Sequence, residues 1–228
     1  MIFGGLQKLT LLDFPGAVAC IVFTKGCNFL CPFCHNALLV NKVDQAQEID
    51  EEEIISFLKK RTGVLEGVVI TGGEPLLHPG LEDFIVRVRE LGYRVKLDTN
   101  GSRPEYLKSL VSKGLLDYVA MDIKNSLEKY PKTAGIDRVN TQDIEESIDF
   151  LLLGKVPYEF RTTVTAELHT TQDIVSVARR IEGAAKYFLQ NFKDSGDLVG
   201  QGNSPVSEEN LAKMCTFAKK YVKYCEKR

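Results

Sequence analysis

Short apolar runs alternate with helix-like segments along most of this chain, and this alternation limits its fold more than any other feature. The apolar runs contain Val, Ile and aromatic residues, which favour buried strands. The predicted strands cover residues 18–24, 67–70, 93–97, 116–123, 158–165 and 186–190. The predicted helices cover residues 50–60, 80–91, 103–113, 140–153 and 171–181, followed by an amphipathic C-terminal helix over residues 204–225.

Strands that alternate with helices form right-handed βαβ units around a parallel sheet. A closed eight-unit barrel typically needs about 250 residues. The chain has 228 residues and fewer units, so the pattern predicts either a partial, open barrel or a doubly wound sheet. Both architectures place the functional site at the carboxyl ends of the strands. The length fits a single domain over residues 1–228.

Composition excludes several function classes. The 29 Lys and Arg residues nearly balance the 31 Asp and Glu residues, for a net charge of −2. A general affinity for nucleic acid or anionic lipid would need a basic surplus. No apolar run approaches the roughly 20 residues of a membrane span, and the N-terminus lacks the charged region of a secretory signal. We therefore expect a cytoplasmic protein whose cysteines do not form disulfides by default.

Three of the six cysteines lie close together in the segment GCNFLCPFCHN. Cys27, Cys31 and Cys34 have the spacing C-x3-C-x2-C within a predicted loop over residues 25–36. Structural zinc usually takes four protein ligands, often from two separated pairs, and no second pair is present here. Three thiolates suit a [4Fe–4S] cluster with one iron open to a ligand. The alternatives are a zinc knuckle completed by His35 and unconnected core cysteines.

The cysteine segment, with aromatic Phe33 directly before the third cysteine, resembles the signature of the radical S-adenosylmethionine (radical SAM) enzymes. This resemblance implies an α/β fold: a partial (β/α)6 TIM-like barrel with a parallel sheet and outer helices. It implies that S-adenosylmethionine (SAM) chelates the open iron and that Phe33 packs near the adenine. Reductive cleavage of SAM at the cluster would give a 5′-deoxyadenosyl radical, which abstracts hydrogen from a substrate.

Two glycines and an acid follow the strand predicted at residues 67–70. Gly72 and Gly73 allow the backbone to approach a ligand closely, and Glu74 comes next. An ordinary turn before a helix could have the same composition. At this distance after the cysteine loop, the segment resembles the GGE motif of the radical SAM enzymes. That resemblance implies contact with the amino group of the methionine part of SAM.

Charged residues end the next two predicted strands. Asp98 lies in LDTNG, whereas Asp122 and Lys124 lie in MDIK. Such residues are costly to bury unless they are paired, and a ligand with an ammonium and a carboxylate would pair with Asp98 and Lys124. The alternative is a solvated loop start. Both segments resemble the glycyl-radical-enzyme activating group, which implies that Asp98 contacts the methionine amino group and Lys124 the carboxylate. That group can also hold a monovalent cation between the equivalents of Asp98 and Asp122.

Arg161 lies in the middle of the strand predicted at residues 158–165. If its side chain points into a barrel, the guanidinium needs an anionic or hydroxyl partner. The resemblance implies a place near the ribose or carboxylate of SAM. The alternative is an Arg that faces the surface of an alternating strand.

The remaining histidines and cysteines are given structural roles. His78 and His169 fall in polar loops, where we expect solvated side chains. Cys20 lies in an apolar strand, and Cys215 and Cys225 lie ten residues apart on the predicted C-terminal helix. Unpaired cysteines of this kind are most often small buried apolar residues.

The stretch of residues 1–36 resembles the start of proteins that activate anaerobic ribonucleoside-triphosphate reductase, a glycyl radical enzyme. This resemblance implies hydrogen abstraction from a glycine of a partner protein in an anaerobic cytoplasm, with an electron donor such as flavodoxin or ferredoxin. Between Cys34 and Gly72 lie 37 residues without cysteine, so we expect no inserted module with further clusters.

Two other functions remain open from the sequence. The first is a radical SAM enzyme that acts on a small molecule, such as the ring precursor in deazaguanine synthesis. The second is a non-catalytic iron–sulfur or zinc binding module. SAM cleavage that depends on a partner protein would distinguish an activating enzyme from an enzyme with a small-molecule substrate. Anaerobic reconstitution with iron, followed by an assay of SAM cleavage, tests whether the protein is a non-catalytic binding module.

Overall fold

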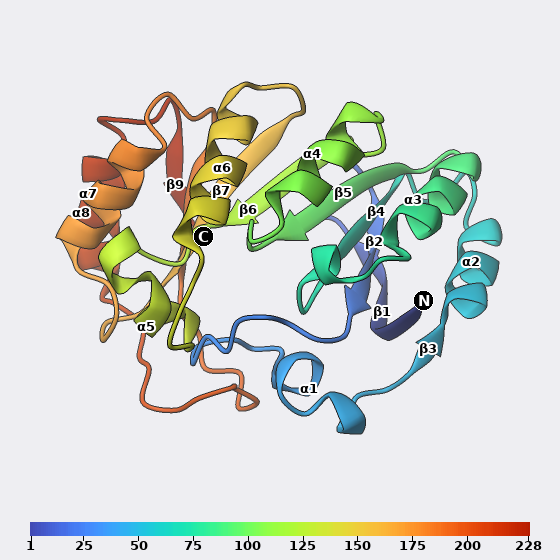
Figure 1. Ribbon diagram of the computed structural model, residues 1–228, viewed down its shortest axis with the longest axis horizontal. Coiled ribbons are helices and arrows are strands. Elements are labelled where there is room, and N and C mark those ends of the chain that lie inside the picture. The colour runs from blue at the N-terminus through green and yellow to red at the C-terminus, as the bar shows by residue number, and fades with distance from the viewer.

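The computed structural model describes all 228 residues. Nine strands form one open sheet in the order β3-β1-β2-β4-β5-β6-β7-β8-β9 (Figure 1). β1 is antiparallel to both of its neighbours, and all other pairs are parallel. The strands are β1 (Ile2–Thr10), β2 (Ala19–Thr24), β3 (Ile49–Asp50), β4 (Gly67–Gly72), β5 (Arg94–Thr99), β6 (Tyr118–Asp122), β7 (Tyr158–Val164), β8 (Tyr187–Asn191) and β9 (Cys225–Lys227).

Helices follow most of the parallel strands and cover the outer face of the curved sheet. Figure 1 shows α2, α3 and α4 along one half of the sheet and α6, α7 and α8 along the other half. The helices are α1 (Ala37–Val40), α2 (Glu51–Lys59), α3 (Leu81–Glu90), α4 (Pro104–Ser112), α5 (Tyr130–Ala134), α6 (Thr141–Leu152), α7 (Thr171–Arg180) and α8 (Glu208–Ala218). Short 3₁₀ turns lie at Val43–Gln45, Pro75–Leu77 and Leu127–Lys129.

The six predicted strands are confirmed as β2 and β4 to β8, and the five predicted helices between them as α2, α3, α4, α6 and α7. Local signals mark several helix ends. The Asp50 carboxylate accepts a hydrogen bond from the Glu52 backbone N–H and caps α2. Pro104 is the first residue of α4, where its missing N–H costs nothing.

Three strands were not predicted, and all lie towards the edges of the sheet. β1 contains two glycines and several polar residues, and β3 is only two residues long. β9 has the sequence CEK, and the charged side chains on this edge strand discourage pairing with another chain. These segments lack the apolar pattern of a buried strand, so tertiary pairing decides their conformation.

The prediction of a C-terminal helix over residues 204–225 is wrong in its extent. α8 covers only Glu208–Ala218, and the chain then turns into β9. The Lys223 N–H donates to the Ala184 carbonyl and the Tyr187 N–H donates to the Tyr224 carbonyl. Val222 and Cys225 are buried, and their spacing of three residues suits one face of a helix. Pairing with β8 decides between the two conformations.

The two faces of the sheet differ sharply in chemistry. Val95, Leu97 and Val119 belong to the large apolar core beneath the outer helices. Their neighbours on the opposite face include buried Lys96 and partly buried Asp98, whose charged side chains pair with each other. A second layer of helices on this face would bring apolar side chains against charged groups, which is costly. The sheet is therefore an open, partial barrel with outer helices and not a doubly wound sheet.

The turn that contains Phe14 covers the amino-terminal end of the barrel. Phe14 packs with Ala19, Val69 and Tyr118 in a small apolar cluster on the inner face of the sheet. Its ring lies 5.4 Å from the guanidinium of Arg94. This turn, which directly precedes the first parallel strand, thus closes the end of the barrel opposite the carboxyl ends of the strands.

Phe14→Ala should lower the free energy of unfolding by about 3–5 kcal/mol, because Phe14 is buried and its loss leaves a cavity in a small apolar cluster. Urea titration monitored by circular dichroism measures this loss. Leu12→Ala is the matched control, since Leu12 lies in the same turn but is 87% exposed, and it should change stability by less than about 0.5 kcal/mol. Equal losses for the two variants would contradict this role of Phe14.

Candidate functional site

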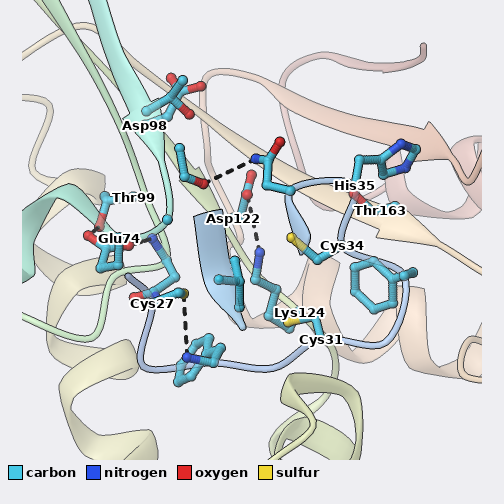
Figure 2. A pocket seen from close by; sticks show the side chains of 18 residues that line it. Cys27, Cys31, Cys34, His35, Glu74, Asp98, Thr99, Asp122, Lys124 and Thr163 are labelled. Atoms are coloured by element: carbon cyan, nitrogen blue, oxygen red, sulfur yellow. Dashed lines mark hydrogen bonds and ion pairs between the residues drawn. The ribbon is translucent and has the colours of Figure 1, made fainter. Parts of the chain in front are cut away.

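A cavity of about 190 Å³ opens at the carboxyl ends of the parallel strands. One wall is the loop over residues 25–36, and the other is formed by the ends of β4, β5 and β6 with the loops that follow them. Figure 2 shows the cysteines on the loop and the acidic residues on the strand ends. Ten of the residues predicted from sequence line it: Cys27, Cys31, Phe33, Cys34, Gly72, Gly73, Glu74, Asp98, Asp122 and Lys124.

The loop over residues 25–36 is held in place by backbone contacts on both sides. The Leu30 N–H donates to the Ala134 carbonyl at the end of α5 (2.8 Å), and the Gly26 N–H donates to the Leu39 carbonyl in α1 (2.7 Å). The Val199 N–H donates to the Cys34 carbonyl, so the segment after β8 also contacts the loop. These contacts present three cysteines from one short loop to one cavity.

Burial governs the protonation of the three thiols. It raises the pKa of Cys27 to about 11 and that of Cys31 to about 12, and it also raises the pKa of Cys34. Thiolates are the metal-binding form, so the loading of this site must release protons. The Phe29 N–H, 3.4 Å from the Cys27 sulfur, already provides one donor for a thiolate.

A zinc knuckle completed by His35 does not fit this geometry. No three His, Cys, Asp or Glu side chains are arranged to hold a single metal ion, and the His35 ring packs edge-on against Phe192 at 5.8 Å. A tetrahedral zinc site needs all its ligands within about 2.3 Å of one point. A [4Fe–4S] cluster does not need its protein ligands to converge on one point, because each thiolate binds a different iron atom. The donor set of three thiols therefore fits the cluster.

Two glycines bring the end of β4 against the backbone of the cysteine loop. The Glu74 N–H donates to the Gly26 carbonyl at 2.8 Å, and the Gly73 N–H donates to the Thr24 carbonyl at 2.9 Å. A Cβ on Gly73 would lie 1.9 Å from the Gly26 oxygen, and Gly72 has a φ of +114°. Only glycine tolerates both conditions. The GGE segment therefore aligns the strand end with the cysteine loop.

The Glu74 carboxylate holds two neighbouring strand ends together. It accepts hydrogen bonds from the Thr99 hydroxyl (2.7 Å) and from the backbone N–H groups of Asn100 (2.7 Å) and Leu76 (3.1 Å). Glu74 is 1% exposed. Burial raises the pKa of its carboxyl to about 7, although these donors oppose the rise. Glu74 thus lines the cavity and also positions the end of β5.

Arg161 points into the barrel and lies directly beneath the cavity. Its guanidinium donates to Asp98 at 3.0 Å and to Asp122 at 2.8 Å. Lys96 also pairs with Asp98. The monovalent cation between Asp98 and Asp122 stays a prediction, and in this structure the Arg161 guanidinium bridges the two carboxylates.

Charge compensation keeps Asp122 ionised despite its burial. Burial alone would raise its pKa, but Arg161 and Lys124 outweigh that effect and hold the pKa well below its usual range. Lys124 lies 3.2 Å from Asp122 and also near Cys31 and Cys34. Burial disfavours the charged form of Lys124, whereas the Asp122 carboxylate and the neighbouring cysteines raise its pKa. The floor of the cavity thus presents a fixed ammonium beside the cysteine loop.

Asn100 is a site residue that the sequence analysis quoted within LDTNG but did not single out. Its amide nitrogen lies 3.9 Å from the Cys27 sulfur and donates to the Asn28 side chain at 2.9 Å. Its amide oxygen accepts from the Ser102 N–H. The rule that polar residues at strand ends form the site could have identified Asn100, since it directly follows β5.

The prediction of two solvated histidines is wrong. His169 is 3% exposed, and its Nδ1 accepts a hydrogen bond from the Thr165 N–H (3.1 Å). Its Nε2 therefore carries the proton and donates to the Lys124 carbonyl (2.8 Å). His78 is half-buried, and its Nε2 lies 2.8 Å from the Lys25 carbonyl. Both imidazoles bind backbone carbonyls next to the site, which composition could not show.

Comparison with known proteins agrees with this geometry. Residues 21–184 match the family description "Radical SAM superfamily". The chain belongs to the radical SAM superfamily. Enzymes of this superfamily use a [4Fe–4S] cluster and SAM, and these are the cofactors of this radical SAM chain.

Two curated relatives differ in how much of the radical SAM chain they match. A Methanocaldococcus jannaschii protein, provisionally named a glycyl-radical enzyme activating enzyme, is 32% identical over 96% of this chain and 92% of its own length. A 7-carboxy-7-deazaguanine synthase of Clostridium acetobutylicum is 30% identical over 57% of this chain and 58% of its own length. Among solved structures, Streptococcus suis SuiB bound to SAM has a TM-score of 0.68 at 12% identity, over 91% of this chain and 51% of that one. The structural likeness supports the radical SAM fold.

The contribution of His169 to the stability of this radical SAM chain should fall as the pH drops below about 6.5, the ordinary pKa of His. Burial lowers the pKa of His169 in the folded state, so the unfolded chain binds this proton first. The stabilising contribution of His169 therefore rises with pH over this window. The free energies of unfolding of wild type and His169→Gln are measured between pH 5 and pH 8, and the difference, wild type minus variant, should increase with pH. Parallel curves would mean that His169 takes up its proton equally in both states.

Proposed function

We propose that this radical SAM enzyme activates a glycyl radical enzyme by abstracting hydrogen from a glycine of that partner. The observation that carries the proposal is the match to the Methanocaldococcus jannaschii relative, which covers 96% of this chain and 92% of that protein. A match of this extent leaves only 4% of the chain outside it, so it includes the cysteine loop and the ends of β4 to β7. The proposal treats residues 1–228 as one radical SAM domain that needs no further cluster module.

Three cysteines would hold the cluster. Cys27, Cys31 and Cys34 line one cavity from one loop. The strand ends that form the opposite wall of that cavity contain no further cysteine. When bound, the cluster supplies the single electron that cleaves the sulfonium C–S bond of SAM and so generates the 5′-deoxyadenosyl radical. The protein contributes binding, orientation and electrostatics to this chemistry.

The residues around the cavity fit the zwitterionic methionine part of SAM. The Lys124 ammonium, held beside the cysteine loop by Asp122, would pair with the carboxylate. Asp98 and the segment from Gly72 to Glu74 line the wall that would face the amino group. Phe33 lines the same cavity and packs edge-on near His169 at 6.3 Å, which suits contact with the adenine.

Arg161 would act indirectly. It does not line the cavity, and its guanidinium is shared between Asp98 and Asp122. In the proposed function it holds both carboxylates in place beneath SAM, instead of contacting the ribose as the resemblance implied.

The partners follow from the proposed reaction. The hydrogen donor would be a glycine of a large protein, such as anaerobic ribonucleotide reductase, and the electron would come from flavodoxin or ferredoxin. The near-neutral composition, with a net charge of −2, does not favour nucleic acid. No helix of the protein is long and apolar enough to span a membrane.

A small-molecule substrate is the second candidate. The observation in its favour is the 30% identity to a 7-carboxy-7-deazaguanine synthase. That match covers 57% of this chain, against 96% for the activating-enzyme relative, so it reaches a smaller part of the molecule.

Release of 5′-deoxyadenosine decides between these candidates. The reconstituted, reduced protein is incubated anaerobically with SAM and a candidate glycyl radical enzyme, and the partner is examined by electron paramagnetic resonance. We expect cleavage to rise when the partner is added, with a glycyl radical signal that is lost when the radical-forming glycine is replaced by Ala. Turnover with a deazaguanine precursor and no response to any glycyl radical enzyme would contradict the proposal.

Each of Cys27→Ala, Cys31→Ala and Cys34→Ala should abolish SAM cleavage and the visible iron–sulfur absorption after reconstitution, since each removes one of three ligands. Iron analysis and absorption spectroscopy measure the loss. Cys215→Ala is the matched control, because Cys215 is buried in α8 and does not line the cavity. Equal iron loss in the control would show that the assignment of three cysteines is incomplete.

A further inference from the structure

Two cysteines that the site does not use lie in contact with each other. The sulfurs of Cys215 and Cys225 are 3.3 Å apart, and both side chains are buried, with 6% and 1% exposure. Cys215 belongs to α8 and Cys225 to β9. The sequence places them ten residues apart, and the turn after α8 brings them face to face. Cys20, the other cysteine away from the cavity, is buried in β2 without a sulfur neighbour.

The surroundings of this cysteine pair favour a disulfide bond over a metal site. No three His, Cys, Asp or Glu side chains are placed to hold a metal ion, so the pair lacks the further ligands of a zinc or iron site. A disulfide bond is about 2.05 Å long, so the sulfurs need to move closer by only about 1.3 Å. We propose that Cys215 and Cys225 are a reversible disulfide site that cross-links β9 to α8.

The cross-link would secure a weakly held part of the sheet. β9 has three residues and pairs only with β8. Short edge strands open more readily than central ones. A bond between Cys225 and α8 would keep the strand docked even when its backbone hydrogen bonds break.

The residue directly after β9 forms an ion pair with a buried carboxylate of β7. The chain end after β9 continues its pairing with β8, through the hydrogen bond from the Arg228 N–H to the Leu189 carbonyl. The Arg228 guanidinium lies 3.4 Å over the Phe188 ring and donates to Glu159 at 3.2 Å. The Glu159 side chain is 2% exposed and also accepts from the Tyr118 hydroxyl. Loss of β9 would therefore leave a buried carboxylate without its cation.

The oxidant class in this proposal is a low-molecular-weight disulfide such as glutathione disulfide. One cysteine thiolate attacks a sulfur of the glutathione disulfide and releases one glutathione thiolate. The second cysteine thiolate then attacks the mixed disulfide, forms the Cys215–Cys225 bond and releases the second glutathione thiolate. The protein loses two electrons and two protons, and glutathione disulfide gains both as two thiols.

Access to the pair depends on the edge strand. Burial and the neighbouring sulfur raise the pKa of the Cys225 thiol, so the reactive thiolate is scarce while β9 is docked. Opening of this three-residue strand exposes Cys225 to the oxidant. The second exchange step returns β9 to α8, so the reaction is expected to be slow but to end in the docked state.

Peptide mapping tests the proposal without reference to SAM cleavage. The cluster-loaded protein is treated anaerobically with glutathione disulfide, alkylated in denaturant and digested with trypsin without reduction. Because Lys213, Lys219, Lys223 and Lys227 flank the two cysteines, peptides 214–219 and 224–227 separate unless they are cross-linked. We expect a linked peptide 2 Da lighter than the sum of its parts, and an alkylated Cys20 peptide in the same sample.

The cross-link should also raise the melting temperature of the oxidised protein by several degrees, and dithiothreitol should reverse the rise. Cys225→Ser is the matched variant, and it should give no linked peptide and no rise. Two alkylated peptides or persistent glutathione adducts in wild type would overturn the disulfide assignment. A linked peptide with an unchanged melting temperature would overturn the cross-linking role. Failure of the glycyl-radical proposal affects neither readout.

Discussion

The close approach of the end of β4 to the cysteine loop is the constraint on which the rest of the site depends. Gly73 lies so near the Gly26 carbonyl that a Cβ would be 1.9 Å from its oxygen, and the Glu74 N–H donates to that same carbonyl. Glu74 then extends the alignment to β5 through Thr99 and Asn100. One loop and two strand ends are thereby held in fixed positions around the cavity that lies between them.

A second constraint comes from charges enclosed by the barrel. Arg161 bridges Asp98 and Asp122, and Lys96 and Lys124 supply the remaining compensation. Loss of one partner from such a buried set typically costs about 3–5 kcal/mol, because it leaves an unpaired charge in a medium of low polarity. These residues therefore support the fold and shape the floor of the cavity. The lysine that would pair with the SAM carboxylate is part of this set, which links stability to cofactor binding.

Sequence patterns identified the central features because those features are local. The six parallel strands are apolar runs, the cysteine loop is one short segment, and Gly72 to Glu74 directly follow a strand. The patterns failed where distant partners decide the outcome. The chain after Ala218 satisfies helical spacing and nevertheless forms β9, since β8 offers it backbone hydrogen bonds. His169 lies in a polar segment, yet its side chain is buried. Both ring nitrogens form hydrogen bonds with backbone groups, the Thr165 N–H and the distant Lys124 carbonyl.

The sequence by itself determined the α/β class, the superfamily and ten residues that line the cavity, because these depend on periodicity, on spacing within one loop and on the rule that parallel strands end at one edge. Only the tertiary structure decided that a guanidinium fills the space between Asp98 and Asp122, and that Cys215 faces Cys225. Both outcomes join residues far apart in the chain or separated by a turn. The distance between such side chains is fixed by packing, which no local pattern encodes.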